Sequence, residues 1–294
     1  DHALPGMLFG AVVRSPHAHA VIRRIDTSKA EAAPGVKAVI TSADFPEIPP
    51  EKVTQGTAPT NFQHLSDNLM ARRKALYDGH AVAAVAATSA QAARRAAALV
   101  EVEYEVLPHV VDVDAAMAAD APLLHEQMKT AGVEASEPSN VAKRVSFALG
   151  DLEAGFAAAE VVIEQNYTTA PVHQGYIEPH ACLASVNPDG GAELWVTTQG
   201  PFSYRNVCAR LLGLDFASLK VTASEIGGGF GGKTHVWIEP VALALARKSN
   251  RPVKMVMSRE EVFKGSGPTC ATSMDVKIGA KKDGTITAAF IECR

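Results

Sequence analysis

The chain has 294 residues, 47 % of them apolar and 20 % charged, so it can bury a full core, and its length favours two domains over one. Its 28 basic residues are scattered among 32 acidic ones and leave a formal net charge of −4, which argues against a nucleic-acid partner. No apolar run approaches the roughly 20 residues of a membrane span, and the four cysteines lie too far apart for a C-x-x-C metal or redox site. We therefore expect a globular cytoplasmic protein; because the chain opens at Asp1 without a Met, a periplasmic location stays open.

The first 120 residues predict mixed α and β structure. Short β-prone or apolar runs bounded by turn residues predict strands at 10–14, 36–41 and 81–87. Thr88-Ser89-Ala90-Gln91 fits the capping box that satisfies free backbone donors at a helix start, and an alanine-rich helix should run from there to about Leu99. Apolar residues then alternate with glutamates from Val100 to Val106, which is the period of a half-buried strand. We therefore expect a β-α-β unit at residues 81–107.

A region rich in Ala, Asp, Glu, Ser and Pro, without sustained periodicity, follows at residues 112–145. This composition suits an exposed connection, which we place at 121–145, between a first domain at 1–120 and a second at 146–294. Strands of the second domain are predicted at 161–169, 181–186, 193–198, 219–226, 253–257, 275–278 and 285–291. Helices are predicted from Pro201 to Gly213 and from Ile238 to Lys248, so Gln199 lies at a junction between a strand and a helix.

Residues 227–234, Gly-Gly-Gly-Phe-Gly-Gly-Lys-Thr, form a loop in which five glycines let backbone amides approach a negatively charged ligand. The loop matches the Walker A pattern, in which Lys233 would reach a phosphate and Thr234 would hold magnesium. The context of the pattern is poor, because Pro240 would break a helix that ran on from the loop and no later strand ends in a magnesium-binding acid. A P-loop-type NTP-binding protein stays open as an alternative.

An ordered set of short motifs resembles the large subunits of the molybdenum hydroxylases, the family of xanthine dehydrogenase, aldehyde oxidase and carbon monoxide dehydrogenase. In chain order these motifs are Leu4–Leu8, Arg14–Ala20, Pro34–Val36, Val100–Tyr104, Leu107–Pro108, Gly150–Asp151, His173 with Glu178–Pro179, Thr198–Gln199 and Gly227–Lys233. The resemblance spans essentially the whole chain. It implies an α+β fold in which a hammerhead-type α/β domain is followed by the first part of the molybdopterin-binding domain.

In this family a molybdenum held by a pterin dithiolene hydroxylates a substrate carbon with water-derived oxygen, and the resemblance implies that this chain is part of such an enzyme. By motif position, Gln199 matches the glutamine whose side-chain amide hydrogen-bonds an oxygen ligand of the metal. The main-chain amides that approach the metal's oxo group and the pterin correspond to Gly228, Gly229, Phe230 and Gly231. No side chain of this chain is expected to ligate the metal directly. Carbon hydroxylation would therefore depend on a cofactor held by neutral donors.

One departure from the family pattern concerns the substrate. Purine-oxidising members carry a glutamate directly after the loop lysine, where this chain has Thr234 in the expected substrate pocket, so a xanthine substrate is disfavoured. Aldehydes, aromatic acyl thioesters, N-heterocycles and carbon monoxide stay open.

The family's general-base glutamate is expected beyond Arg294, so this chain alone should not catalyse. The resemblance implies a molybdenum-molybdopterin cofactor in the cytosine dinucleotide form. It also implies three partners: the remaining molybdenum-domain chain or segment, an FAD-binding subunit and a 2Fe-2S subunit. A non-catalytic assembly subunit of the same fold is a further alternative.

His173, Glu178 and His180 have the residue types of a metal triad, but Pro179 breaks the segment and keeps three ligands off one face. We expect structural roles for all three.

Overall fold

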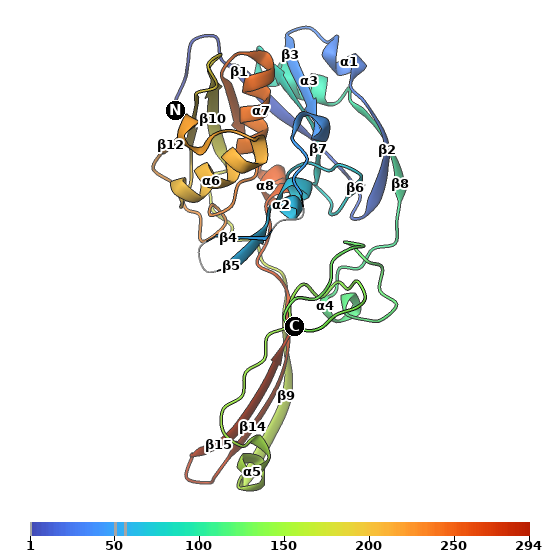
Figure 1. The fold of residues 1–294 in the computed structure, drawn as a ribbon, viewed down its shortest axis with the longest axis vertical. Helices are drawn as coiled ribbons and strands as arrows, with labels where there is room; N and C mark the ends of the chain where they lie inside the picture. Colours follow the sequence, from blue (N-terminus) through green and yellow to red (C-terminus); the bar gives the residue numbers. More distant parts are fainter. Residues whose placement is uncertain (1, 50–51, 56–57) are drawn as a thin grey trace. The chain divides into compact units, whose positions relative to one another are not determined.

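The computed structural model describes residues 2–49, 52–55 and 58–294 (Figure 1). The chain forms two compact units that are each discontinuous in sequence. The first unit comprises Asp1–Leu107 and Gln174–Gly267, and the second comprises Pro108–His173 and Pro268–Arg294.

The first unit is built on a seven-stranded mixed sheet with the order β12-β11-β10-β13-β1-β7-β3. Its strands are β1 (Leu8–Arg14), β3 (Val36–Thr41), β7 (Ala81–Ala87), β10 (Ala181–Val186), β11 (Ala192–Val196), β12 (Leu219–Ala223) and β13 (Val253–Val256). Two pairs are parallel, β1 with β13 and β11 with β12, and the other neighbours are antiparallel. The pairing of Leu8 with Val253 joins the first strand of the chain to one that comes far later in the sequence.

Helices cover both faces of this sheet, which explains why all seven residues of β7 are buried. On one face, Val39 and Val85 pack in a small core with Ala30 of α1 (Ser28–Glu31) and Ala96 of α3 (Ala90–Ala97). On the other face, the residues of β3 and β7 that alternate with Val39 and Val85 belong to the main core. Helices α6 (Pro201–Leu212) and α7 (Glu239–Ser249) contribute to this core. The predicted hairpin at 181–198 is present as β10 and β11, and Gly213 ends α6 with φ 63°.

The predicted β-α-β unit at 81–107 is wrong in its pairing, because β7 and β8 lie in different sheets. Strand β8 (Glu101–Val106) belongs to a three-stranded sheet with β2 (Ala20–Asp26) and β6 (Lys74–Ala75), in the order β6-β2-β8. Its alternating glutamates form exposed ion pairs with Lys29, Arg24 and Arg23. A strand with one charged, solvated face cannot continue a sheet that is covered on both faces.

The predicted capping box at Thr88 to Gln91 is also wrong by one residue. Ser89 is the N-cap of α3, and its side chain accepts a hydrogen bond from Ala92 N at 3.1 Å. The third helical residue is therefore an alanine, which has no side-chain acceptor to complete a capping box. The helix ends at Ala97, close to the predicted end.

The second unit contains a three-stranded antiparallel sheet in the order β15-β14-β9. Its strands are β9 (Val161–Thr169), β14 (Thr272–Ala280) and β15 (Ile286–Cys293), and its helices are α4 (Val113–Ala116) and α5 (Leu152–Ala157). The predicted strands at 161–169 and 275–278 fall within this sheet, and the one predicted at 285–291 lies in it from residue 286. One face carries the exposed apolar side chains of Ile163, Tyr167, Ile278 and Ile291.

The remaining elements of the described residues are short. They are the 3₁₀ helices η1 (Ser42–Asp44) and η2 (Phe216–Ser218), the strands β4 (Lys52–Gln55) and β5 (Ala58–Asn61), and the helices α2 (Phe62–Leu69) and α8 (Arg259–Gly265). The longest helix in the described part of the chain, α6, has 12 residues, and no helix there has the length and apolar character needed to cross a membrane.

Candidate functional site

The glycine loop connects β12 to α7 in the first unit, but it does not run directly into the helix. Helix α7 begins at Glu239 with Pro240 in its first turn, five residues after the loop ends at Thr234. In a Walker A site the loop lysine stands at the start of the helix, so its amides and the helix N-terminus face the same phosphate. The helix of this chain begins too late for that arrangement.

The backbone of the loop is held in conformations that require small residues. Gly228 and Gly231 have φ values of 94° and 91°, and Phe230 has a φ of 48° while 74 % of its surface is exposed. A Cβ atom added at Gly229 would lie 2.5 Å from Gln199 Oε1, and one added at Gly232 would lie 2.6 Å from Tyr176 Cε1. Larger residues at these two positions would push the loop away from the side chains that support it.

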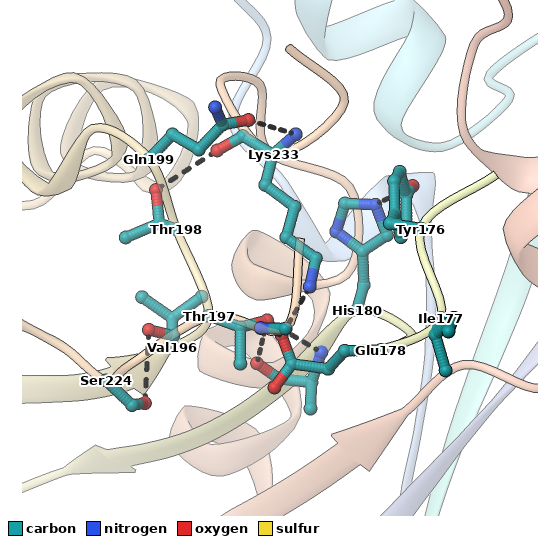
Figure 2. Close-up of polar contacts among 12 residues, drawn as sticks. Tyr176, Ile177, Glu178, His180, Val196, Thr197, Thr198, Gln199, Ser224 and Lys233 are labelled. Atoms are coloured by element: carbon teal, nitrogen blue, oxygen red, sulfur yellow. Dashed lines mark hydrogen bonds and ion pairs between the residues drawn. The ribbon is translucent and has the colours of Figure 1, made fainter. Parts of the chain in front are cut away.

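Gln199 supports the loop through its side-chain oxygen. Its Oε1 accepts hydrogen bonds from Gly231 N at 3.1 Å and from Lys233 N at 3.2 Å, the second of which is drawn in Figure 2. Because two backbone N–H groups point at this atom, it must be the carbonyl oxygen, and Nε2 must be the donor end of the amide. Within the described residues, Nε2 has no hydrogen-bond partner.

Three amides at the centre of the loop also have no hydrogen-bond partner within the described residues, namely those of Gly228, Gly229 and Phe230. The other loop amides are bonded internally: Gly227 N to Glu178 Oε2, Gly231 N and Lys233 N to Gln199, Gly232 N to Gly229 O, and Thr234 N to Gly231 O. Gly231 therefore contributes its backbone conformation to the loop, while its amide is already bonded. The loop and Gln199 together present four neutral donors.

Lys233 does not present its charge at the loop surface. Its side chain is 0 % exposed, and Nζ lies 2.5 Å from Glu178 Oε2 and 5.1 Å from the centroid of the Tyr176 ring (Figure 2). The Thr234 hydroxyl is also bonded internally, because Oγ1 donates to Gly231 O at 2.7 Å. A phosphate-binding lysine and a magnesium-binding threonine would both have to face the ligand, so this geometry argues against an NTP site.

Two of the three residues considered as a metal triad have other partners within the first unit. Glu178 pairs with Lys233. His180 is buried and its Nε2 lies 2.6 Å from the hydroxyl of Tyr176, whose pKa is raised by burial. Among the residues that the structure describes, no group of three or more His, Cys, Asp or Glu side chains is arranged to hold a metal ion.

Sequence reasoning missed one buried acid near this site, Glu239. Its side chain is fully buried at the start of α7, where burial raises its pKa to about 7. A glutamate in the first turn of a helix that is apolar from Pro240 to Ala246 was the available signal.

Comparison with known proteins identifies related sequences over nearly the whole chain. The aldehyde oxidase and xanthine dehydrogenase a/b hammerhead domain matches residues 1–108, and the molybdopterin cofactor-binding domain matches residues 133–294. The probable hypoxanthine oxidase XdhD of Escherichia coli (strain K12) is 35 % identical over 96 % of this chain and 32 % of its own length. The carbon monoxide dehydrogenase large chain of Afipia carboxidovorans is 38 % identical over 98 % of this chain and 36 % of its own length.

Solved structures show the same relationship. The CO dehydrogenase from Oligotropha carboxidovorans superposes with a TM-score of 0.84 at 36 % identity, over 99 % of this chain and 36 % of its own. The quinoline 2-oxidoreductase from Pseudomonas putida 86 superposes with a TM-score of 0.85 at 30 % identity, over 100 % of this chain and 36 % of its own. The chain thus spans about a third of the length of these relatives. These matches confirm the predicted α+β fold, and the chain belongs to the molybdenum hydroxylases, the family of molybdopterin oxidoreductases that includes xanthine dehydrogenase, aldehyde oxidase and CO dehydrogenase.

Proposed function

We propose that Gln199 and the loop Gly228–Gly231 hold the molybdenum-molybdopterin cofactor of a hydroxylase that oxidises a substrate carbon with water-derived oxygen. The observation that supports this is the donor set, which consists of three central loop amides without an internal partner and the Nε2 amide of Gln199. All four donors are neutral, which suits a group whose own oxygens carry negative charge. When bound, the cofactor would supply the two-electron oxidation.

The residues present fit such a group. A Cβ added at Gly231 would meet no atom within 4 Å, so the loop is open on that side, while Gly229 is closely backed by Gln199. A ligand can therefore approach the backbone of the central loop without meeting a side chain at these glycines. The one loop cation, Lys233, is neutralised inside the protein, so binding would depend on hydrogen bonds from the loop rather than on its charge.

Gln199 would orient one donor toward the cofactor. Two loop amides fix its Oε1, and this leaves Nε2 as the group that can donate outward. A glutamate at this position could still accept from both amides, but its second oxygen would repel an anionic ligand. The neutral amide thus combines loop support and ligand donation in one side chain.

Thr234 would lie at the substrate pocket, where it offers a small neutral group. A threonine has no carboxylate to offer a purine ring, and its hydroxyl already donates to Gly231 O. We propose a non-purine substrate, such as an aldehyde, an aromatic acyl thioester, an N-heterocycle or carbon monoxide.

The whole enzyme would need more polypeptide than this chain. We propose that a further molybdenum-domain segment supplies the general base and that electrons leave through 2Fe-2S and FAD groups on partner chains or domains. The cofactor would be the cytosine dinucleotide form, and the enzyme would be cytoplasmic. We propose that the chain divides between its two family matches, at 1–108 and 133–294; the gap between them, 109–132, overlaps the expected connection 121–145 only in part.

Elemental analysis of the protein isolated from its host, with the chains that accompany it, tests this function. We expect about one molybdenum per chain. Gln199→Ala should lower the molybdenum content and the turnover while the protein still folds, with the loss of its two hydrogen bonds to the loop costing about 1–3 kcal/mol of stability. Gln91→Ala, at an exposed position on α3 of the same unit, is the matched control. Protein without molybdenum that keeps full oxidoreductase activity would contradict the proposal.

A further inference from the structure

One carboxylate oxygen ties the two ends of the glycine loop together. Glu178 Oε2 accepts a hydrogen bond from Gly227 N at 2.8 Å and pairs with Lys233 Nζ at 2.5 Å (Figure 2). Glu178 N also donates to Gly227 O at 3.4 Å. The loop is thereby fastened to the segment that precedes β10, 49 positions earlier in the sequence.

The burial of the lysine distinguishes this ion pair from others in the first unit. The Lys233 side chain is 0 % exposed, whereas Lys220 in its pair with Glu193 is 72 % exposed. An ammonium group removed from water is costly unless a counter-charge accompanies it, and breaking such a pair destabilises a protein far more than breaking an exposed one. The Tyr176 ring at 5.1 Å adds a weaker attraction. Glu178 is therefore the group that stabilises the buried charge.

Every polar group of Lys233 is held in place. Its N–H donates to Gln199 Oε1, its carbonyl accepts from Gln199 N at 3.0 Å and from Thr198 Oγ1 at 3.3 Å, and its Nζ is held by Glu178. The central amides, from Gly228 to Phe230, have no such restraint within the described residues. The position of the free donors is therefore set by the two ends of the loop, and both ends meet at Glu178.

We propose that Glu178 is a positioning residue for the cofactor-binding loop and that Lys233 is its buried counter-charge rather than a ligand-binding cation. The inference rests on the function proposed for the loop. Loss of the carboxylate charge should weaken the attachment of both ends of the loop and shift the central donors without removing any of them.

Hydrogen exchange of the full chain tests the proposal. Wild type and Glu178→Gln are prepared from cells that make no molybdopterin, so that bound cofactor contributes no protection. Peptide 227–234 reports four internally bonded amides, those of residues 231 to 234, and their exchange shows how firmly the loop is held. We expect this peptide to exchange at least about tenfold faster in Glu178→Gln, and peptide 181–196 of the neighbouring hairpin to exchange at the wild-type rate.

Glu193→Gln is a matched control, because the two carboxylates are almost equally exposed, at 29 % for Glu193 and 31 % for Glu178. Its lysine partner is exposed, so the loop peptide should keep its wild-type rate. Should Glu178→Gln fail to fold, the double variant Glu178→Gln/Lys233→Met removes both charges and leaves no unpaired ammonium. Its loop peptide should still exchange faster, since the link between residues 178 and 233 is lost.

Wild-type exchange of peptide 227–234 in both variants would overturn the proposal. An equal increase in peptides 227–234 and 181–196 would also overturn it, because Glu178 would then stabilise the whole unit and not the loop. Molybdenum content, measured on the same variants made in cells that synthesise molybdopterin, distinguishes the role of Glu178 from the proposed function of the loop. Faster loop exchange with an unchanged molybdenum content would refute cofactor binding by the loop, while Glu178 would still be shown to hold it.

Discussion

Glu239 gives the first unit a pH-dependent stability that one substitution should remove. Its Oε2 accepts a hydrogen bond from Trp237 N at 2.7 Å, and its Oε1 has no partner within the described residues. Burial raises the pKa of Glu239 from 4.5 to about 7, although hydrogen bonds from backbone amides act in the opposite direction. Between these two pH values the folded protein keeps a proton that the unfolded chain has released.

The sign of the effect follows from this proton. Because the folded state binds more protons than the unfolded state, the free energy of unfolding falls as pH rises from about 4.5 to about 7, and it levels off above that range. A shift of this size in the pKa of a fully buried group corresponds to about 3 kcal/mol. Glu239→Gln is uncharged at every pH and keeps an oxygen that can accept from Trp237 N, so it should lose this slope.

Urea denaturation of wild type and Glu239→Gln at several pH values between 5 and 8 measures the effect. Both tryptophans, Trp195 and Trp237, belong to the first unit, so their fluorescence reports its unfolding. The stability of wild type relative to the variant should fall by about 2.5 kcal/mol from the acid to the alkaline end of the series. Parallel stability curves for the two proteins would refute a buried carboxyl with a raised pKa.

The remaining predictions concern a buried histidine and the loop. His80 accepts a hydrogen bond from Leu76 N through Nδ1, and burial lowers the pKa of His80 to about 4. The contribution of neutral His80 to the free energy of unfolding is therefore lost as pH falls from about 6.5 to 4. The urea midpoint of His80→Gln should not show this fall. Gly229→Ala should displace Gln199, break its two hydrogen bonds to the loop at a cost of about 1–3 kcal/mol, and lower the molybdenum content. Gly200→Ala, whose Cβ would meet no atom closer than 3.7 Å, should keep the wild-type molybdenum content. Equal molybdenum content in the two variants would contradict this role of Gly229. Equilibrium dialysis with magnesium-ATP should show no binding that depends on Lys233, and saturable binding lost in Lys233→Met would contradict the buried lysine.

Local patterns in the sequence predicted most elements near the site, but not their pairing. Pro201 and Gly213 bound α6 as expected, because each acts through its own backbone geometry. The sheet that carries β7 was not predictable in this way, since no local pattern specifies that β1 pairs with β13 while β8 pairs with β2. Which strands pair over such distances in sequence depends on which faces of the strands become buried.

For the site, the sequence placed Gln199 and the glycine loop together only through the family resemblance. The hydrogen bonds that fix the direction of the Gln199 amide depend on how two distant segments meet. The letters Gly-Lys-Thr are the same whether the lysine faces a phosphate or is buried, so the environment of Lys233 had to come from the structure. The contact between Glu178 and Gly227 also joins distant segments. The sequence predicted a structural role for Glu178, but only the structure shows that the glycine loop is what it supports.

The most direct test of the central claim is a high-resolution structure of the protein isolated from its host with its cofactor in place. The account predicts density for a molybdenum-pterin group with its oxygens within hydrogen-bond distance of the Phe230 amide and Gln199 Nε2, and with Lys233 still paired to Glu178. A cofactor bound elsewhere in the protein, or a nucleotide triphosphate bound at Lys233, would contradict it.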